Sequence, residues 1–435
     1  MAIVNVERNR TILEITIILF VFIVVNIASQ VFQQPISYNQ GQGWDGTHYF
    51  QVAEQISKGL KIREDAPFVY RIGTPFLVAL FFKNNLLFGF KIVNIIANLL
   101  STILLKFWLH LYLNNWRIRT FLVILFITHG LGSVRFTYFY PTLVDPWLIV
   151  ILLIGLIGIE RFRYRPCFSV VSLLGIVSFL GVMIRESALI IPIAFAFVTN
   201  PIPPFKNFFH SLSELRIFQI IKKQYQILFL PLLCAVLGIL LVKLLASQNN
   251  DYSFMKAVIQ WTYGKPTLTY LHSYFITYGL FIILPIYSWR TLNKFLWRNQ
   301  FILIYLLGMI VLSRIGGADT ERFLFWAMPV VYLLIGIAIQ ENKILLNSPW
   351  VLLFLVISLI CSQRLFWIIP NYPNSFLTPI PFLTILSNKF QYLDLFSWYG
   401  KRVIQAISLF QYLFLSTILL LWLNHRAKVT KLTKD

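Results

Sequence analysis

Residues 41–82 form a polar interval between the first two apolar stretches and contain the side chains with the clearest chemical potential. Asp45 lies between Gly43 and Gly46, and glycines allow a substrate to approach the backbone closely. A carboxylate in this position could act as a general base on a hydroxyl group. Aromatic rings that could contact a sugar ring or an acyl chain lie beside it, at Trp44, His48 and Tyr49.

Further ionisable side chains occur where other apolar stretches end. They are Arg71, Asp145, the adjacent pair Arg185-Glu186, and the run Asp319-Thr320-Glu321-Arg322. Ionisable groups at membrane depth are costly and usually face a cavity or a partner. Because these residues and Asp45 are expected on one side of the membrane, we predict that they line a single polar cavity open to that side.

The arginines indicate an anionic ligand, because a guanidinium stays protonated and fits the geometry of a phosphate. The candidates are Arg71, Arg185, Arg314 and Arg322. At a bilayer surface the obvious phosphate belongs to a lipid headgroup. A base aimed at a hydroxyl and a clamp on a phosphate leaving group describe transfer from a lipid phosphate to an alcohol. In this scheme Glu186 and Asp319 would orient the arginines or bind sugar hydroxyls.

Purely structural roles are the alternative for each of these residues. Arg185 could pair with Glu186 or Asp145, and Arg322 with Asp319, so that the pairs only hold helix ends together. Asp45 could N-cap a helix that begins near Thr47, a role compatible with catalysis. The histidines lack the spacing of a zinc centre, so no metal cofactor is expected. A divalent ion between Asp45 and Asp145 or Asp319 is left as an alternative.

The composition is typical of a membrane protein. Hydrophobic residues make up 58% of the 435 residues and charged residues 12%, against about 25% charged in soluble domains. Apolar runs of about 20 residues recur along the chain, which predicts an all-α polytopic membrane protein in one domain, 1–435. The net charge of +21 fits basic cytoplasmic loops rather than nucleic-acid binding. The three cysteines lie in or beside apolar stretches and indicate no disulfide framework.

Charge alternation predicts about twelve spans with both termini cytoplasmic, because most inner loops carry basic residues and few acids. The first outer loop, 32–83, is predicted to hold an amphipathic helix from Tyr49 that ends near Gly59, and a second interfacial or re-entrant helix over 71–82. A third span is predicted from Thr120 to residues 135–140, and an apolar hairpin over 168–199 with Arg185 and Glu186 at its tip. Further loops are predicted at 200–226, 247–268 and 370–402.

Several of these motifs resemble the GT-C superfamily of membrane glycosyltransferases, in particular bacterial relatives of the GPI mannosyltransferases. The similarity rests on Trp44-Asp45-Gly46 to Tyr49, on Arg71 to Pro75, on Arg185 to Ala188, and on Asp319 to Arg322 leading to Pro329. The resemblance implies a polyprenyl-phosphate sugar donor and a catalytic Asp in the first outer loop, here Asp45. The chain departs from the protein-mannosyltransferase branch, because Gly46 and Thr47 stand where that branch carries paired acids.

The sequence therefore predicts sugar transfer to a hydroxyl of a glycan, lipid or protein acceptor on the extracytoplasmic side of a bacterial inner membrane. Asp45 is the predicted catalytic base. The predicted substrate-binding residues are Trp44, His48, Tyr49, Arg71, Asp145, Arg185, Glu186, Asp319 and Arg322. The alternative functions are a transporter or flippase, or a non-catalytic component, of a system that assembles lipid-linked polysaccharides.

Overall fold

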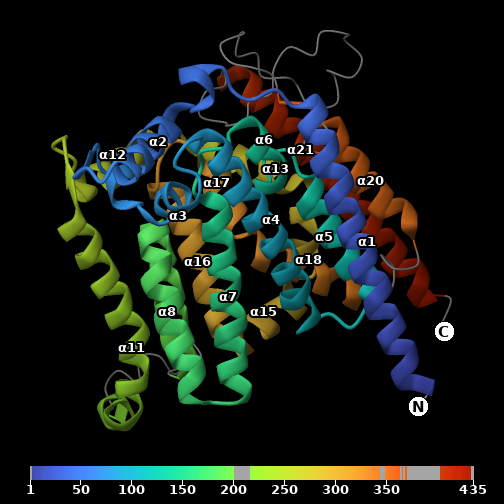
Figure 1. Cartoon of the computed structure of the whole chain (residues 1–435). Helices are drawn as coiled ribbons and strands as arrows, with labels where there is room; N and C mark the ends of the chain where they lie inside the picture. The colour runs from blue at the N-terminus through green and yellow to red at the C-terminus, as the bar shows by residue number, and fades with distance from the viewer. Residues whose placement is uncertain are drawn as a thin grey trace.

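The computed structural model describes residues 2–199, 216–342, 348–362, 365, 368–369 and 402–432, and most of this part of the chain is helical (Figure 1). The predicted all-α fold class is therefore confirmed for the described residues. The predicted loops 200–226 and 370–402 lie mainly outside them, so those two predictions remain predictions.

The described residues contain four helices that are long and apolar enough to cross a membrane: Asn9–Phe32, Leu86–His110, Thr267–Tyr287 and Gln405–Val429. Two bent helix pairs raise this number to six if each pair is one span. Several other predicted spans are shorter apolar helices, among them Phe168–Ile184 and Pro349–Cys361. The membrane-protein character is thus retained, whereas the predicted count of about twelve spans is not confirmed.

The first polar interval contains the two predicted helices. It follows α1 (Ala2–Phe32), and its elements are η1 (Tyr38–Gly41), α2 (Trp44–Ser57), β1 (Ile62–Glu64), η2 (Phe68–Tyr70) and α3 (Gly73–Phe81). Gly59, with a φ of 66°, follows the end of α2 as predicted, since a positive φ suits glycine. The predicted helix over 71–82 is α3.

A short parallel sheet, which the sequence did not predict, ties this interval to a distant loop. Strand β1 pairs with β2 (Ala246–Gln248), with Ile62 opposite Ala246 and Glu64 opposite Gln248. The Asn250 side chain continues the contact, because it donates to the Ala66 carbonyl at 3.1 Å and accepts from the Ala66 N–H at 3.0 Å. The predicted loop 247–268 also contains a helix, α12 (Phe254–Gly264).

The next part of the chain agrees with prediction except at the third span. Its helices are α4 (Leu86–His110), α5 (Trp116–Thr128), α6 (Ser133–Phe139), α7 (Asp145–Tyr164), α8 (Phe168–Ile184), η3 (Glu186–Leu189), α9 (Ile190–Thr199) and α11 (Arg216–Leu245). The predicted third span is wrong as one helix, because the chain leaves the helical conformation at His129, where ψ is 129°, and resumes at Ser133. Arg185 separates α8 from η3 and α9, as the hairpin prediction requires.

The last part of the chain is built from short and bent helices. They are α13 (Thr267–Tyr278), η4 (Gly279–Ile282), α14 (Ile283–Tyr287), α15 (Trp289–Arg298), α16 (Gln300–Ile315), α17 (Thr320–Trp326), α18 (Met328–Glu341), α20 (Pro349–Cys361) and α21 (Arg402–Leu432). The axes of α15 and α16 differ by 109°, and those of α17 and α18 by 63°. The second bend places α17, with its charged first turn, at one end of the bundle.

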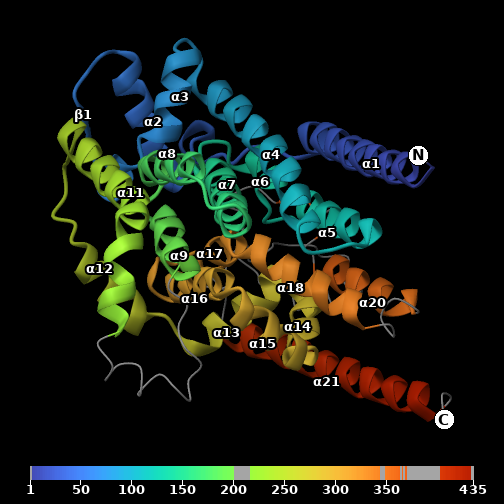
Figure 2. The ribbon, with the colours of Figure 1, turned by 90° about the horizontal axis from the view of Figure 1, so that it is seen from below.

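The helices that carry the predicted site residues gather at one end of the molecule. In Figure 1, α2, α3 and α17 lie near the upper end, while the N and C termini lie toward the lower end. Seen from below, α1 and α21 lie on opposite flanks with α5, α18 and α20 between them (Figure 2).

A buried ion pair holds α1 against the bundle near the other end. Glu14 of α1 is fully buried and accepts two hydrogen bonds from Arg119 of α5, at 3.0 and 2.9 Å, with Lys106 of α4 at 3.9 Å. Many apolar side chains in the rest of α1 are exposed. The ion pair is therefore the main specific polar contact of the N-terminal half of this helix among the described residues.

Glu14→Gln is expected to destabilise the protein by about 3 kcal/mol, because removing one partner of a buried pair leaves the other charge uncompensated. Thermal or denaturant unfolding in detergent measures the effect. The matched control is Glu54→Gln, which breaks the exposed Glu54–Lys58 pair at 2.8 Å and should cost less than about 0.5 kcal/mol. Equal stability of the two variants would contradict the assigned role of Glu14.

Candidate active site

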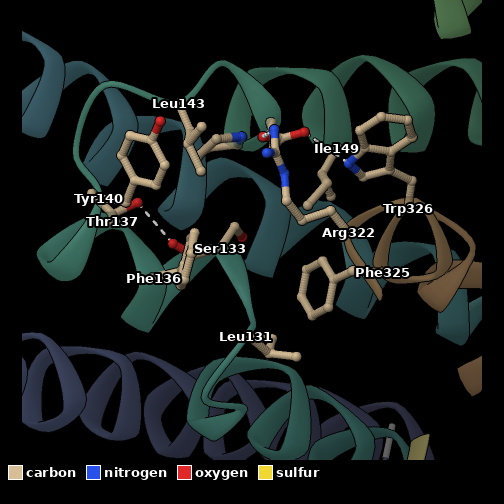
Figure 3. Close-up of a pocket in the computed structure, with 12 residues that line it drawn as sticks. Leu131, Ser133, Phe136, Thr137, Tyr140, Leu143, Ile149, Arg322, Phe325 and Trp326 are labelled. Carbon is tan, nitrogen blue, oxygen red and sulfur yellow. Dashed lines mark hydrogen bonds and ion pairs between the residues drawn. The ribbon is translucent and has the colours of Figure 1, made fainter. Parts of the chain in front are cut away.

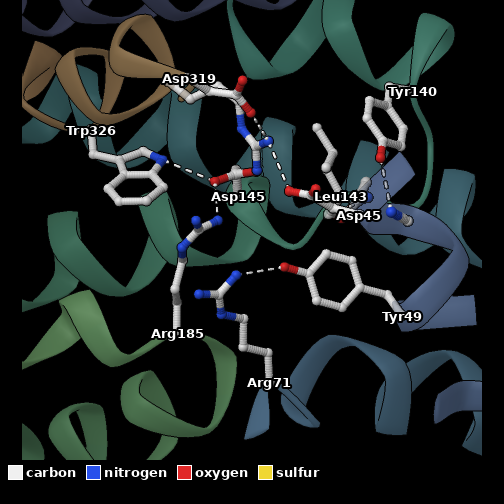
Figure 4. Close-up of polar contacts among 12 residues, drawn as sticks. Asp45, Tyr49, Arg71, Tyr140, Leu143, Asp145, Arg185, Asp319 and Trp326 are labelled. Atoms are coloured by element: carbon white, nitrogen blue, oxygen red, sulfur yellow. Dashed lines mark hydrogen bonds and ion pairs between the residues drawn. The ribbon is translucent and has the colours of Figure 1, made fainter. Parts of the chain in front are cut away.

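The carboxylates of Asp45, Asp145 and Asp319 lie close together (Figure 4), and the side chain of Arg322 contacts all three. Its Nη1 donates to Asp319 at 2.7 Å and to Asp45 at 3.2 Å, and its Nη2 donates to Asp145 at 2.9 Å. These carboxylates come from α2, from the first residue of α7 and from the residue before α17. One buried guanidinium thus joins three elements that are far apart in the sequence.

A second arginine approaches Asp145 from the other side. Arg185, at the junction of α8 and η3, donates from Nη1 to Asp145 Oδ1 at 3.0 Å. The indole Nε1 of Trp326 donates to the same oxygen at 3.1 Å, and the Arg185 guanidinium lies 4.4 Å above the Trp326 ring. Asp145 is therefore fully engaged by two arginines and a tryptophan, which suits it to positioning rather than to proton transfer.

Arg71 forms the third cationic position of the cluster. Its Nε donates to Glu186 at 3.1 Å and its Nη1 donates to the Tyr49 hydroxyl at 2.9 Å. Burial lowers the pKa of the Arg71 guanidinium, but Glu186, Tyr49 and Asp45 together outweigh this effect, so that the pKa lies above its ordinary value. Burial also raises the pKa of Tyr49 despite the nearby Arg71, so Tyr49 remains a neutral phenol. The site keeps a permanent positive charge here.

Two glycines place Asp45 in this cluster. Helix α2 begins at Trp44 with Gly43 as its N-cap residue, and Asp45 lies in its first turn. The alternative that Asp45 caps a helix starting near Thr47 is therefore wrong. Gly43 has a φ of 73°, and a Cβ on Gly46 would lie 1.8 Å from Thr142 Oγ1, so both positions require glycine. The Gly46 N–H donates to the Tyr140 hydroxyl at 2.8 Å, which holds α2 against the start of α7.

Among the three carboxylates that contact Arg322, Asp45 is the most exposed. Its side chain is 29% exposed, against 22% for Asp319 and 11% for Asp145. Burial raises the pKa of Asp319, whereas the charge of Arg322 opposes that rise. Asp45 Oδ2 accepts one hydrogen bond at 3.2 Å from Arg322, whereas its other carboxylate oxygen accepts none from the described residues. That oxygen has the freedom a general base needs.

The structure brings together most, but not all, of the predicted site residues. Hydrogen bonds and ion pairs join them in two neighbouring groups: Arg322 with Asp45, Asp319, Asp145 and, through Asp145, Arg185, and Arg71 with Tyr49 and Glu186. Glu186 pairs with Arg71, so a pair between Arg185 and Glu186 is not the arrangement found. Arg314 lies apart and donates to the Thr262 carbonyl at 3.1 Å.

Trp44 and His48 project away from this network. The Trp44 ring stacks on Tyr38 at 5.7 Å and meets Tyr140 edge-on at 6.1 Å. The His48 ring stacks on Phe68 at 4.5 Å, and its Nδ1 lies 3.0 Å from Glu64. Both residues therefore pack on aromatic rings around the first turns of α2.

Trp326 and Tyr140 belong to the site but were missed by the sequence analysis. Trp326 follows Arg322 by one helical turn, and residues four apart share a helix face, so this spacing was a usable signal. Tyr140 lies in an aromatic run before Pro141, and no pattern distinguishes it from the neighbouring rings. Arg322 also lies between the aspartates that were considered as ligands of a divalent ion.

A mostly apolar cavity adjoins the charged cluster (Figure 3). It is partly open to the surroundings, and Asp145 and Arg322 contribute to its wall. The apolar lining comes from α6, α7, α17 and the residues between α5 and α7, and includes Leu131, Phe136, Leu143, Ile149, Phe325 and Trp326. The arrangement offers an apolar surface directly beside a fixed cation.

No protein-family model matches the chain, and neither does any curated protein. Two solved structures resemble it in part. ArnT from Cupriavidus metallidurans, bound to undecaprenyl phosphate, is 13% identical, with 93% of this chain and 76% of ArnT covered and a TM-score of 0.48. The apo oligosaccharyltransferase from Archaeoglobus fulgidus is 13% identical over 90% of this chain, with a TM-score of 0.45, and the match spans 56% of its length.

Both matched proteins are members of the GT-C superfamily, the family that the sequence motifs resemble. Because both TM-scores are below 0.5, neither match decides what this chain does, and its function is inferred from its own side chains.

Gly46→Ala is expected to destabilise the protein by about 1–3 kcal/mol, because the added methyl group must displace Tyr140 and Thr142. Thermal unfolding in detergent measures the loss. The control is Gly264→Ala in α12, where nothing lies within 4 Å of the added Cβ, and this variant should unfold like the wild type. A Gly46→Ala protein as stable as this control would show that α2 does not pack as described.

Proposed function

We propose that the chain is an integral membrane glycosyltransferase that moves a sugar from a polyprenyl-phosphate donor to an acceptor hydroxyl. The observation that carries the proposal is the position of Asp45. It is the most exposed of the three carboxylates that contact Arg322, and Arg185 and Arg71 lie close to the same cluster. A base and a set of fixed cations beside an apolar cavity are the parts that this reaction requires.

Asp45 acts as the general base in the proposed reaction. It takes the proton of the acceptor hydroxyl while the acceptor oxygen bonds to the anomeric carbon of the sugar. The bond between that carbon and the phosphate oxygen breaks, the electron pair leaves with the polyprenyl phosphate, and the configuration at the anomeric carbon inverts. No other group has to accept or supply a proton in this step.

The arginines stabilise the departing phosphate. Arg322 lines the cavity, and its buried Nε has no hydrogen-bond partner among the described residues, so it has a donor to spare. Arg185 uses only Nη1 in its ion pair with Asp145. A phosphate oxygen that accepts these remaining N–H groups would satisfy a buried donor, which otherwise costs about 1–3 kcal/mol. Glu186 and Asp319 orient the arginines.

The apolar cavity receives the first units of the polyprenyl chain. Phe136, Ile149 and Phe325 offer hydrocarbon and aromatic surface next to Arg322, so that a headgroup and its tail can be bound together. The site faces the extracytoplasmic side of a bacterial inner membrane, because the chain termini, with their basic residues, lie toward the opposite end of the bundle.

Asp45→Asn is expected to lower sugar transfer by about 10²–10⁴-fold with little change in stability. The amide oxygen can still accept from Arg322, and Gly43 remains the N-cap, but an amide cannot take a proton from a hydroxyl. Release of polyprenyl phosphate from a panel of polyprenyl-phosphate sugars, with acceptors supplied in liposomes, measures the rate.

The control for charge is Asp251→Asn, an exposed aspartate in the loop after β2, which should keep the wild-type rate. Wild-type transfer by the Asp45→Asn protein would remove Asp45 as the base. If the wild-type protein releases no polyprenyl phosphate from any donor in the panel, the result favours the alternative functions, a transporter or a component of the assembly system.

Arg322→Lys is expected to lower transfer by about 10²–10³-fold, the usual effect of removing one donor to a developing charge. A lysine keeps the positive charge, but its single ammonium cannot reproduce the fork that contacts three carboxylates. The control is Arg314→Lys, outside the network. Unfolding temperatures are measured in parallel. Full transfer by a stable Arg322→Lys protein would mean that Arg322 only holds the helix ends together.

A further inference from the structure

A second group of ionisable side chains lies in the same loop but uses different residues from the Arg322 network. His48 of α2 faces Glu64 at the end of β1, with 3.0 Å between Nδ1 and Oε1, and Asp65 follows Glu64 in the chain. One ligand atom from each of the three residues lies within 4.8 Å of the other two. In a tetrahedral site with bonds of about 2.0–2.2 Å, ligand atoms lie roughly 3–3.5 Å apart, so small side-chain movements would close this group around an ion.

The partners of these side chains leave the group electrostatically incomplete. Glu64 Oε1 accepts from the Asp65 N–H at 3.0 Å besides facing His48. The Asp65 side chain has no hydrogen bond or ion pair among the described residues, although it lies beside the Glu64 carboxylate. Two carboxylates at this separation repel each other, and one shared imidazole does not offset both charges. A divalent cation bound between the two carboxylates would offset both charges.

We propose that His48, Glu64 and Asp65 bind a divalent transition-metal ion, of which Zn²⁺ is the best fit. One imidazole nitrogen and two carboxylate oxygens are a ligand set that zinc accepts. Mg²⁺ and Ca²⁺ prefer oxygen ligands alone, so the histidine disfavours them. His48 and Asp65 are partly exposed, which leaves access for the ion, whereas Glu64 is buried.

The ion would tie together the two segments that carry the charged residues of the loop. His48 lies on the same helix as Asp45 and directly before Tyr49, while Glu64 and Asp65 lead into η2 and Arg71. Phe68 connects the sites, because its ring stacks on His48 and also lies 5.6 Å from the Arg71 guanidinium. Binding therefore fixes Arg71 relative to α2 without placing the ion in contact with substrate.

Backbone hydrogen bonds already hold Glu64 and Asp65, the two carboxylate residues of the proposed metal site, in place. The Asn249 N–H donates to the Glu64 carbonyl at 3.0 Å, next to the pairing of Glu64 with Gln248. The Val69 N–H donates to the Asp65 carbonyl at 3.0 Å. These backbone contacts hold both carboxylate residues in place without using their side chains, which remain available as ligands.

Metal analysis of the full chain in detergent tests the proposal independently of any transferase activity. The protein is stripped with a chelator, dialysed against Zn²⁺ in the presence of excess Mg²⁺, and passed through gel filtration before its metal content is measured. We expect about one zinc ion per chain. His48→Gln and Asp65→Asn should each weaken zinc binding by more than about 10-fold.

The matched controls make the same chemical changes elsewhere. His425→Gln alters an exposed histidine of α21 and Asp251→Asn an exposed aspartate, and both proteins should keep the zinc. Zinc should also raise the unfolding temperature of the wild type and of both controls, but not of Asp65→Asn. Asp65→Asn keeps the backbone contacts of that residue, so it is expected to fold even if His48→Gln does not.

Three results would overturn the proposal. Zinc lost by the wild type during gel filtration would mean an adventitious ion only. Equal zinc content in Asp65→Asn and in the controls would place the ion elsewhere. Displacement of zinc by Mg²⁺ at equal concentration would contradict the assigned class of ion. Failure of the transferase proposal would leave all three measurements unchanged, because none of them depends on sugar transfer.

Discussion

The ion pairs of Arg322 with Asp45, Asp145 and Asp319 are the constraint on which the rest of the site depends. A buried charge is tolerated only when it is well paired, so this guanidinium requires its carboxylates to be present together. They belong to elements that are widely separated in the sequence. The bend between α17 and α18, the start of α7 and the glycines before α2 all serve to bring them to one point.

The same requirement explains the unusual build of the first polar interval. Helix α2 must come so close to Tyr140 and Thr142 that no side chain fits at Gly43 or Gly46. The segment after α2 carries Arg71 back to Tyr49 and Glu186, and its pairing with β2 fixes its course. A loop that only connected two spans would need none of these contacts.

Much of this was predictable from the sequence where the signal is local. The amphipathic pattern around Tyr49, the apolar stretch after Arg71 and the charged tip between α8 and α9 all appear as helices or junctions near the predicted positions. Pairings between distant segments were not predictable. Nothing in residues 62–64 or 246–248 shows that they pair. No proline marks the break at His129, whereas Pro329 in the first turn of α18 follows the break at Ala327 and was a usable signal. The partner of each arginine likewise depends on the fold: Glu186 and Asp145 were both possible partners of Arg185, and the structure pairs Arg185 with Asp145 and Glu186 with Arg71.

Bracing and catalysis are compatible in this arrangement, because the ion pairs that hold the helix ends also fix the arginines before a substrate binds. A preorganised donor stabilises developing charge without moving at the moment of reaction. Asp145 supplies much of this order, since it binds Arg185, Arg322 and Trp326 at once and has little exposure of its own. Asp45 shares the guanidinium of Arg322 with two other carboxylates, so this cation does not stabilise Asp45 alone. Of the three carboxylates on Arg322, the most exposed is therefore Asp45, which contacts this cation at the longest distance, and this division of roles follows from the geometry of one buried guanidinium.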